Sequence, residues 1–238
     1  MSEPPLVVEA AGVVKNYSGL RPLRIASLAV RQGERIALHG IDGPGAQVFI
    51  DLMTGATLPD AGEVRVFGRS TASLADGDEW LSSLDSYGIV SDRAVLLEAA
   101  TVAQNLALPL TLDIDPLGPE TYAQVRSLAR ECEIEAEWLE GRTNDVPAAV
   151  RVRMHLARAL ALGPRLLLLE HPTATIADDD REPFGALLAR VCEARALTAL
   201  AVTADRAFAG RAAERALTLQ PATGQLVAAR RRWGLFQL

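Results

Sequence analysis

A short apolar strand runs into a glycine-rich turn and then a helix in the stretch RIALHGIDGPGAQVFIDLMTG. Gly40 and Gly45 have the G-x-x-x-x-G spacing of a phosphate-binding loop, with Gly43 between them. Apolar residues recur at helical spacing from Ala46 to Thr54, so we predict a helix over that range that stops at Gly55. A strand, a glycine turn and a helix in this order are typical of α/β proteins.

Two later segments predict strands that are buried on both faces. RLLLLE (165–170) and TALAVTAD (198–205) are almost continuously apolar, as expected for strands of a sheet that is covered on both sides. Each follows a predicted helix, at 150–161 and 181–196. Buried strands that alternate with helices predict an α/β fold with a mixed, largely parallel sheet. The residues from about Asp92 to Asn144 are expected to be mainly helical.

Composition excludes several classes of protein. The net charge of −6 argues against a nucleic-acid-binding protein, so no nucleic-acid partner is expected. The longest apolar runs fall short of the ~20 residues that cross a membrane, and the acidic N-terminus lacks the basic segment of a secretory signal. Cys132 and Cys192 form no ligand pattern, and we expect reduced cysteines, a cytoplasmic protein and no metal site.

The chain resembles the ATP-binding subunits of ABC transporters over nearly its whole length. The resemblance rests on segments that follow in the family's order: LVVEAAGVVKNY, VRQGERIALHGIDGPGAQ, TGATLPDAGEVRVFGR, SYGIVSDRAVLLEAATVAQNLALPL, NDVPAAVRVRMHLARALALGPRLLLLEHPTATIADDD and ALTALAVTADRAFAGRAAERALTL. It implies a P-loop NTPase-like ABC ATPase fold, as one domain over 1–238. The core would comprise 1–91 and 146–238, with an inserted helical subdomain at about 92–145.

The chain departs from the family at the positions that carry chemistry. The phosphate-loop lysine is replaced by Ala46 and the Mg²⁺-binding serine or threonine after it by Gln47, which Val48 follows. The remaining replacements are Asp92 for the Q-loop glutamine, VPAAV (146–150) for the signature, Glu170 for the Walker B aspartate, His171 for the catalytic glutamate, Ala177 or Asp178 at the D-loop aspartate, and Ala204 for the switch histidine.

These replacements predict a subunit that has lost hydrolysis. The missing lysine would neutralise phosphates and the missing hydroxyl would hold Mg²⁺. We therefore expect ATP to bind weakly or not at all and Mg²⁺ binding to be unlikely. The vestigial site is expected to consist of Tyr17, Gly40, Gly43, Gly45, Ala46, Gln47, Val48 and Asp92. A slow but active ABC ATPase and a soluble pseudo-ATPase scaffold are the alternatives.

The resemblance also implies partners and a location. An ABC permease would be the membrane partner, and an ABC-type ATPase homologue or a second copy of this chain the dimer partner. The chain would lie in the cytoplasm, peripheral on the inner face of the cell membrane. The segment from about Asp92 to Pro109 is expected to contact the permease.

Several of these residues also have plainer interpretations. The three glycines form either a residual anion cradle or only a tight turn, and Tyr17 is either an adenine platform or an ordinary tyrosine after a strand. His171 is expected to close a buried strand, with a catalytic base as the alternative. The run Asp178–Asp180 is interpreted as the acidic first turn of a helix. The C-terminal ARRRWGLFQL is expected to fold back onto the core.

Overall fold

The computed structural model describes residues 3–73 and 77–228, so the C-terminal segment discussed above lies outside the described residues. The elements occur in the order β1 (Leu6–Lys15), β2 (Leu23–Arg31), β3 (Arg35–His39), α1 (Gly43–Thr54), β4 (Ala61–Val66), β5 (Arg69–Ser70), η1 (Thr71–Ser73), α2 (Gly77–Ser83), η2 (Leu84–Ser86), β6 (Tyr87–Val90), α3 (Val102–Ala107), α4 (Pro119–Glu131), η3 (Ala136–Trp138), η4 (Thr143–Asp145), α5 (Ala148–Leu160), β7 (Leu166–Glu170), α6 (Asp178–Arg195), β8 (Thr198–Val202), α7 (Arg206–Ala212), β9 (Arg215–Gln220) and β10 (Gln225–Ala228).

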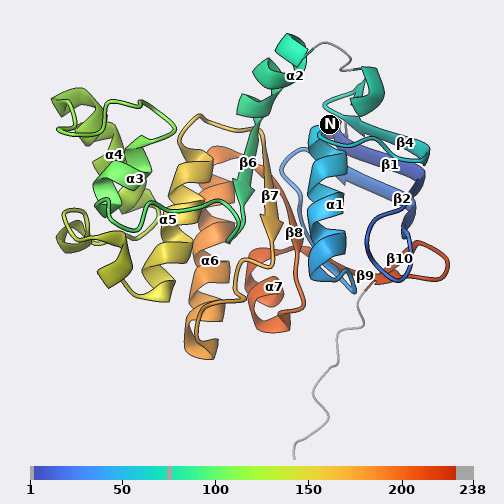
Figure 1. The fold of residues 1–238 in the computed structure, drawn as a ribbon. Coiled ribbons are helices and arrows are strands. Elements are labelled where there is room, and N and C mark those ends of the chain that lie inside the picture. The colour runs from blue at the N-terminus through green and yellow to red at the C-terminus, as the bar shows by residue number, and fades with distance from the viewer. Residues whose placement is uncertain (1–2, 74–76, 229–238) are drawn as a thin grey trace, which may run out of the picture.

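A six-stranded sheet in the order β10-β9-β3-β8-β7-β6 forms the centre of the molecule (Figure 1). Its strands pair in parallel except for β10, which pairs antiparallel to β9. The prediction of a mixed, largely parallel sheet is therefore confirmed. A second, antiparallel sheet has the order β2-β1-β4-β5 and packs with α1 against one face of the central sheet.

The apolar runs of β7 and β8 follow from their position between two cores. Leu166 and Leu168 contact the core formed with α1 and the antiparallel sheet. Leu167 and Leu169 point to the opposite face, where α5 and α6 pack. Successive side chains of a strand alternate between faces, so a strand covered on both sides must be apolar at every position. Burial of each leucine contributes about 2 kcal/mol.

The segment between β6 and α5 is less helical than expected. It contains α3, α4 and two single-turn helices joined by irregular chain, and it forms the lobe at the left of Figure 1. Asn105 holds this segment together, because its fully buried side chain bonds the backbone of Leu97 in both directions and also the Thr143 hydroxyl. The hydrogen bonds of one asparagine side chain thus connect parts of this segment that no regular secondary structure joins.

Helix α1 begins at Gly43, three residues earlier than the sequence pattern predicted. Asp42 is the N-cap: its backbone is extended and its side chain accepts the N–H of Gly45. Pro44 in the first turn has the fixed φ that suits a helix start. An aspartate cap followed by proline is a sequence signal for this boundary. The prediction from Ala46 was wrong because it followed only the apolar periodicity.

Candidate functional site

The connection between β3 and α1 consists of Gly40, Ile41 and Asp42, and its polar groups bond one another. The Asp42 carboxylate accepts the Gly45 N–H at 2.8 Å, and the Asp42 carbonyl accepts the Ala46 N–H at 2.8 Å. A phosphate-binding loop needs its backbone N–H groups free to face the anion. Two of these donors are already satisfied within the turn.

The structural roles of the three glycines differ. Gly40 has a φ of +81°, and a Cβ there would lie 3.0 Å from the carbonyl oxygen of Leu219. Gly45 lies so close to Asp42 that a Cβ would meet its carboxylate at 2.7 Å. Gly43 is the first residue of α1, with open space where a side chain would extend. Packing thus accounts for Gly40 and Gly45 and leaves Gly43 free to vary.

Tyr17 lies over the start of α1. Its hydroxyl donates to the Asp42 carboxylate at 3.3 Å, and its half-buried ring packs against the core beneath α1 and against Gly19. Burial, and after it the charge of Asp42 and the hydrogen bond to it, raise the pKa of the Tyr17 phenol. Tyr17 therefore joins the N-terminal sheet to the glycine turn.

The residues after the turn are placed by the helical period of α1. Ala46 is fully buried in the core, Gln47 is exposed and Val48 is half-buried. Gln47 forms a side-chain hydrogen bond with Asp51, one helical turn further on. A residue at position 46 thus faces the protein interior, while a residue at position 47 faces solvent.

Glu170 is a buried carboxylate at the end of β7, and three donors converge on its Oε2 atom. Ser91 Oγ donates at 2.8 Å, and Arg93 donates from Nε at 2.9 Å and from Nη2 at 2.6 Å. The side chain of Glu170 is 8% exposed, against 42% for that of Arg93. The buried negative charge is thus compensated by a guanidinium from the loop after β6.

His171 and Ala204 lie on the connections that follow β7 and β8. His171 has a φ of 40°, its N–H donates to the Val202 carbonyl, and its buried Nε2 has no hydrogen-bond partner among the described residues. Ala204 is exposed in the bend before α7. The neighbouring carbonyl of Thr203 bonds the His39 Nδ1 at 2.6 Å, which links this bend to the end of β3.

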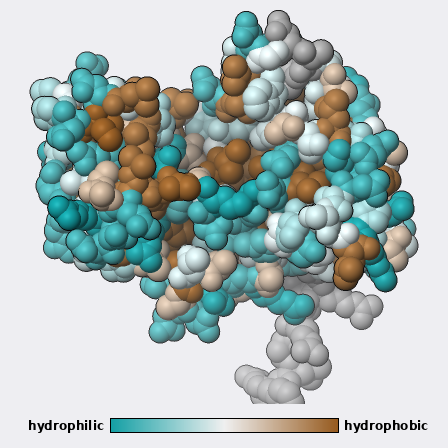
Figure 2. All heavy atoms as spheres, in the orientation of Figure 1, coloured by the Kyte–Doolittle hydropathy of each residue, from teal (hydrophilic) through white to brown (hydrophobic). Residues whose placement is uncertain are grey.

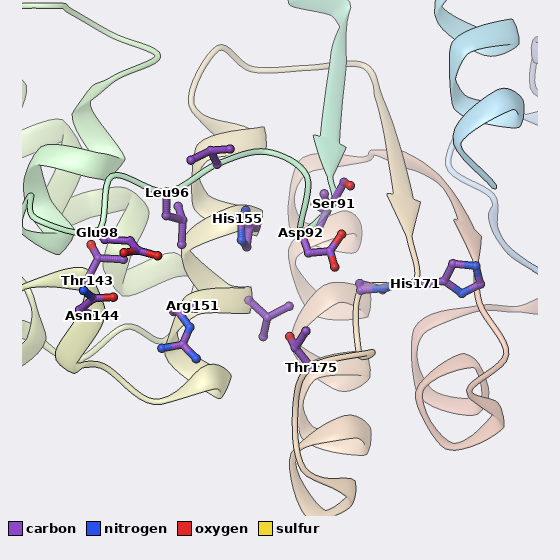
Figure 3. A pocket seen from close by; sticks show the side chains of 14 residues that line it. Ser91, Asp92, Leu96, Glu98, Thr143, Asn144, Arg151, His155, His171 and Thr175 are labelled. Carbon is purple, nitrogen blue, oxygen red and sulfur yellow. The ribbon is translucent and has the colours of Figure 1, made fainter. Parts of the chain in front are cut away.

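Asp92 lies apart from the turn, in a cavity of about 450 Å³ beside α5. The side chains around this cavity come from the loop after β6, from the segment leading into α5, from α5 itself and from the loop after β7 (Figure 3). The Nδ1 atom of His155 is buried here without a hydrogen-bond partner among the described residues. Burial first, and then the charge of Arg158, lower the pKa of His155 to about 4.

The segment 146–150 forms the start of α5. Pro147 is the N-cap and offers no N–H, and Ala148 and Ala149 form the first turn. Arg151 donates to the carbonyl of Val146 at 2.8 Å. The Asp178–Asp180 run forms the first turn of α6 after Ala177, so its interpretation as an acidic helix start is confirmed. Among the described residues, no group of three or more acidic, histidine or cysteine side chains is arranged to hold a metal.

The match to a family model decides the family. The model for ABC transporters matches residues 23–174, which include the glycine turn, the loop after β6, α5 and β7. This chain belongs to the ABC transporter family.

The relatives of this cassette include ATP-binding proteins of several import systems. It is 30% identical over 211 residues to the Fe(3+) ions import ATP-binding protein FbpC 3 of Rhodococcus jostii, covering 87% of this chain and 58% of the relative. It is 32% identical over 213 residues to the sulfate/thiosulfate import ATP-binding protein CysA 2 of Chromobacterium violaceum, covering 86% and 54%. The chain therefore spans little more than half the length of these curated relatives.

Solved cassettes have the same fold. The dimeric ATP-binding cassette MJ0796 bound to ADP and Pi aligns with a TM-score of 0.77 at 25% identity, covering 94% of this chain and 99% of that one. The structure of cbiO1 from Clostridium perfringens aligns with a TM-score of 0.78 at 19% identity, covering 93% and 87%. The predicted ABC ATPase fold is confirmed.

The residues of the cassette do not fit Mg²⁺-ATP. In P-loop enzymes a lysine faces the phosphates, and a hydroxyl and a carboxylate hold the ion. Here Ala46 and Gln47 replace the first two, the N–H groups of Gly45 and Ala46 are satisfied by Asp42, and Arg93 is bound to Glu170.

Sequence reasoning missed Asp42, Ser91, Arg93 and Asp51. Asp42 could have been found from the cap signal before Pro44. Nothing in the local pattern distinguishes Arg93 from an ordinary loop arginine, because its partner lies 77 positions along the chain.

Proposed function

We propose that this chain is the ATP-binding-cassette subunit of an ABC transporter complex, catalytically degenerate, with a structural or regulatory role beside an active ATPase. It would act as one cassette over 1–238, with a core of 1–91 and 146–238 and a helical subdomain at about 92–145. Its place would be cytoplasmic, peripheral on the inner face of the cell membrane. No helix in the described part of the chain is long and apolar enough to cross a membrane.

The start of α1 carries the proposal that ATP binds weakly or not at all. The helix starts at Gly43, and Asp42 uses both its carboxylate and its carbonyl on the donors that would face a phosphate. A carboxylate at that point also repels an incoming phosphate. The hydrogen bonds that a lysine and a hydroxyl would add, about 1.5–3 kcal/mol each, are missing at 46 and 47.

Calorimetry with ATP, with and without Mg²⁺, tests this proposal on the purified chain. We expect no binding heat at concentrations where an intact cassette of the family, run as the positive control, saturates. A Mg²⁺-dependent dissociation constant in the micromolar range, about −8 kcal/mol, would show that the site works and would contradict the proposal.

Exposed apolar side chains on the loop after β6 support a membrane subunit as partner. Figure 2 shows apolar side chains on the face where the helical lobe meets the rest of the molecule. Val95 and Leu97, on the loop after β6, are 72% and 44% exposed, whereas Val102 and Leu106 of α3 are buried. Apolar side chains exposed beside a cavity are typical of interaction surfaces. Within the predicted segment Asp92–Pro109, the loop rather than the helix would therefore contact a permease.

Co-purification from native membranes tests the membrane partner. The unmodified chain should recover a membrane protein, and Val95→Asp should lose it. Leu20→Asp is the matched control, because Leu20 is fully exposed in the connection between β1 and β2. Recovery of the chain without any membrane protein would favour the soluble scaffold instead.

A homologue of the ABC-type ATPases, or a second copy, is the proposed dimer partner. Dimeric cassettes are among the structural relatives of this chain. At the start of α5, however, Pro147 has no N–H to offer and two alanines stand where glycines would let backbone approach a phosphate. Nucleotide would therefore hold such a pair together poorly.

Reconstitution with a hydrolysis-deficient ATPase tests this expectation. The association of the two subunits should not change with ATP, and strong ATP-driven closure of the pair would contradict the proposal.

A slow but active ATPase is the second candidate, and Glu170 is the observation that favours it. A carboxylate is retained at the end of β7, where the family has an acidic residue. Turnover by the purified chain that disappears in Glu170→Gln would support this candidate. Turnover that is equal in both proteins would identify a contaminating ATPase.

A further inference from the structure

The buried carboxylate of Glu170 and the half-exposed guanidinium of Arg93 form an ion pair whose two side chains differ in exposure to solvent. Three hydrogen bonds end on one oxygen, Oε2, and two of them come from Arg93. A buried carboxylate that loses its partner is strongly destabilising, because its charge is then left without water or a counter-ion. Arg93 is therefore the cation that pairs with the buried charge of Glu170.

A second carboxylate lies within electrostatic range of the same guanidinium. Asp51 on α1 is partly buried, and this burial raises its pKa; the charge of Arg93 lowers it and that of Glu170 raises it. Gln47, at the position of the Mg²⁺-binding hydroxyl, bonds Asp51. Arg93 thus interacts with two carboxylates from α1 and β7, the two elements that hold the ion in P-loop enzymes.

The loop that carries Arg93 is tied to its surroundings along its length. The Arg93 N–H donates to Ser91 Oγ at 3.2 Å, and the Ala94 N–H to the Ser91 carbonyl at 3.1 Å. Arg158 of α5 donates to the Val95 carbonyl at 2.8 Å, and Leu97 exchanges two hydrogen bonds with the Asn105 side chain. Arg93 and Ser91 join the loop to the central sheet at Glu170, and Arg93 supplies the charge and two of the three hydrogen bonds.

We propose that the guanidinium of Arg93 is a permanent cation of this site and replaces the divalent ion that accompanies a bound nucleotide. Arg93 also holds the loop Ser91–Leu97 in one position whether or not nucleotide is present. The loop joins the central sheet to the helical lobe, so the lobe would be held in a fixed relation to the sheet. This inference deepens the proposed function, because a regulatory subunit would keep one shape while its active partner cycles.

Hydrogen exchange of the isolated full-length chain without nucleotide tests the anchoring. We expect Arg93→Gln to speed exchange in peptides covering 91–97 by about tenfold, a loss of about 1.4 kcal/mol in local stability. Arg65→Gln is the matched control: its side chain is 46% exposed, close to that of Arg93, but its partner Glu63 is 50% exposed. Arg93→Lys keeps the charge, so its exchange rate in 91–97 should lie closer to that of the unmodified chain. This variant keeps the proposal testable if Arg93→Gln fails to fold.

Added Mg²⁺ tests the replacement of the ion. Millimolar Mg²⁺ should slow the exchange of 91–97 in Arg93→Gln and leave the unmodified chain unchanged. Equal exchange in Arg93→Gln and Arg65→Gln would overturn the proposal, as would a loosened loop that Mg²⁺ does not slow. Calorimetry with ATP tests the proposed function separately, so either can fail without the other.

Discussion

The carboxylate of Asp42 accepts the backbone N–H of Gly45 at 2.8 Å, and this bond fixes where α1 begins. The first N–H groups of a helix have no partner within the helix and must be satisfied by a cap, by water or by a ligand. In this chain a side chain of the turn itself supplies the cap. The same bond therefore defines a helix boundary and occupies a donor of the candidate phosphate site.

The first prediction concerns the two glycines of the first turn. Gly45→Ala should lower the free energy of unfolding by about 1–3 kcal/mol, because the new Cβ would lie 2.7 Å from Asp42 Oδ1 and 3.1 Å from Ile41 Cγ2. Gly43→Ala is the control: it meets nothing within 4 Å and should be neutral or slightly stabilising. Urea denaturation of both variants measures the difference. Equal effects would mean that the turn does not pack as described.

The second prediction concerns restoring a lysine. Ala46→Lys should lower stability by about 3 kcal/mol without creating ATP affinity, because position 46 is fully buried in the core of α1. Gln47→Lys places the same charge on the exposed side and should stay within about 0.5 kcal/mol. Thermal melting and ATP titration measure the two effects. An Ala46→Lys protein of unchanged stability that binds ATP would refute this placement of the helix.

The third prediction concerns the asparagine that holds the helical lobe. Asn105→Ala should cost about 2–4 kcal/mol, because it leaves the Leu97 N–H without its partner and removes one hydrogen bond each from the Leu97 carbonyl and the Thr143 hydroxyl. Asn144→Ala removes an exposed amide and should be close to neutral. Hydrogen exchange should localise the loss to the lobe. An Asn105→Ala chain as stable as Asn144→Ala would contradict it.

The fourth prediction is a loss of stability in mild acid caused by His155. Burial, and after it Arg158, lower the pKa of His155 from 6.5 to about 4, while Asp92 raises it and Arg151 lowers it. Above pH 6.5 the residue is neutral in both states, and its contribution to stability is fully present. As the pH falls toward 4, the unfolded chain takes up the proton first, and stability falls by about 3 kcal/mol.

His155→Asn tests the origin of that loss. Urea midpoints measured above pH 6.5 and near pH 4 should differ less for this variant than for the unmodified chain. The same pH dependence in both proteins would assign the loss to other groups.

The sequence by itself determined the class of fold and the kind of departure from the family. The apolar runs of β7 and β8 required a sheet covered on both faces, since every side chain of a five-residue strand had to avoid water. The absence of any lysine beyond Lys15 and of a hydroxyl at Gln47 could be read directly from the chain. These properties depend on composition and periodicity, which are local.

The tertiary structure alone decided which groups meet at the candidate site. The bond between Arg93 and Glu170 joins residues 77 positions apart and depends on the parallel pairing of β6 with β7, which brings the loop after one strand beside the end of the other. Asp42 before Pro44 is a cap signal for the start of α1, whereas apolar periodicity predicted a start at Ala46. The helix starts at Gly43, because the side chain of Asp42 caps it there. Periodicity reports which face of an element is buried, whereas a charged side chain finds its counter-ion only after the strands have paired.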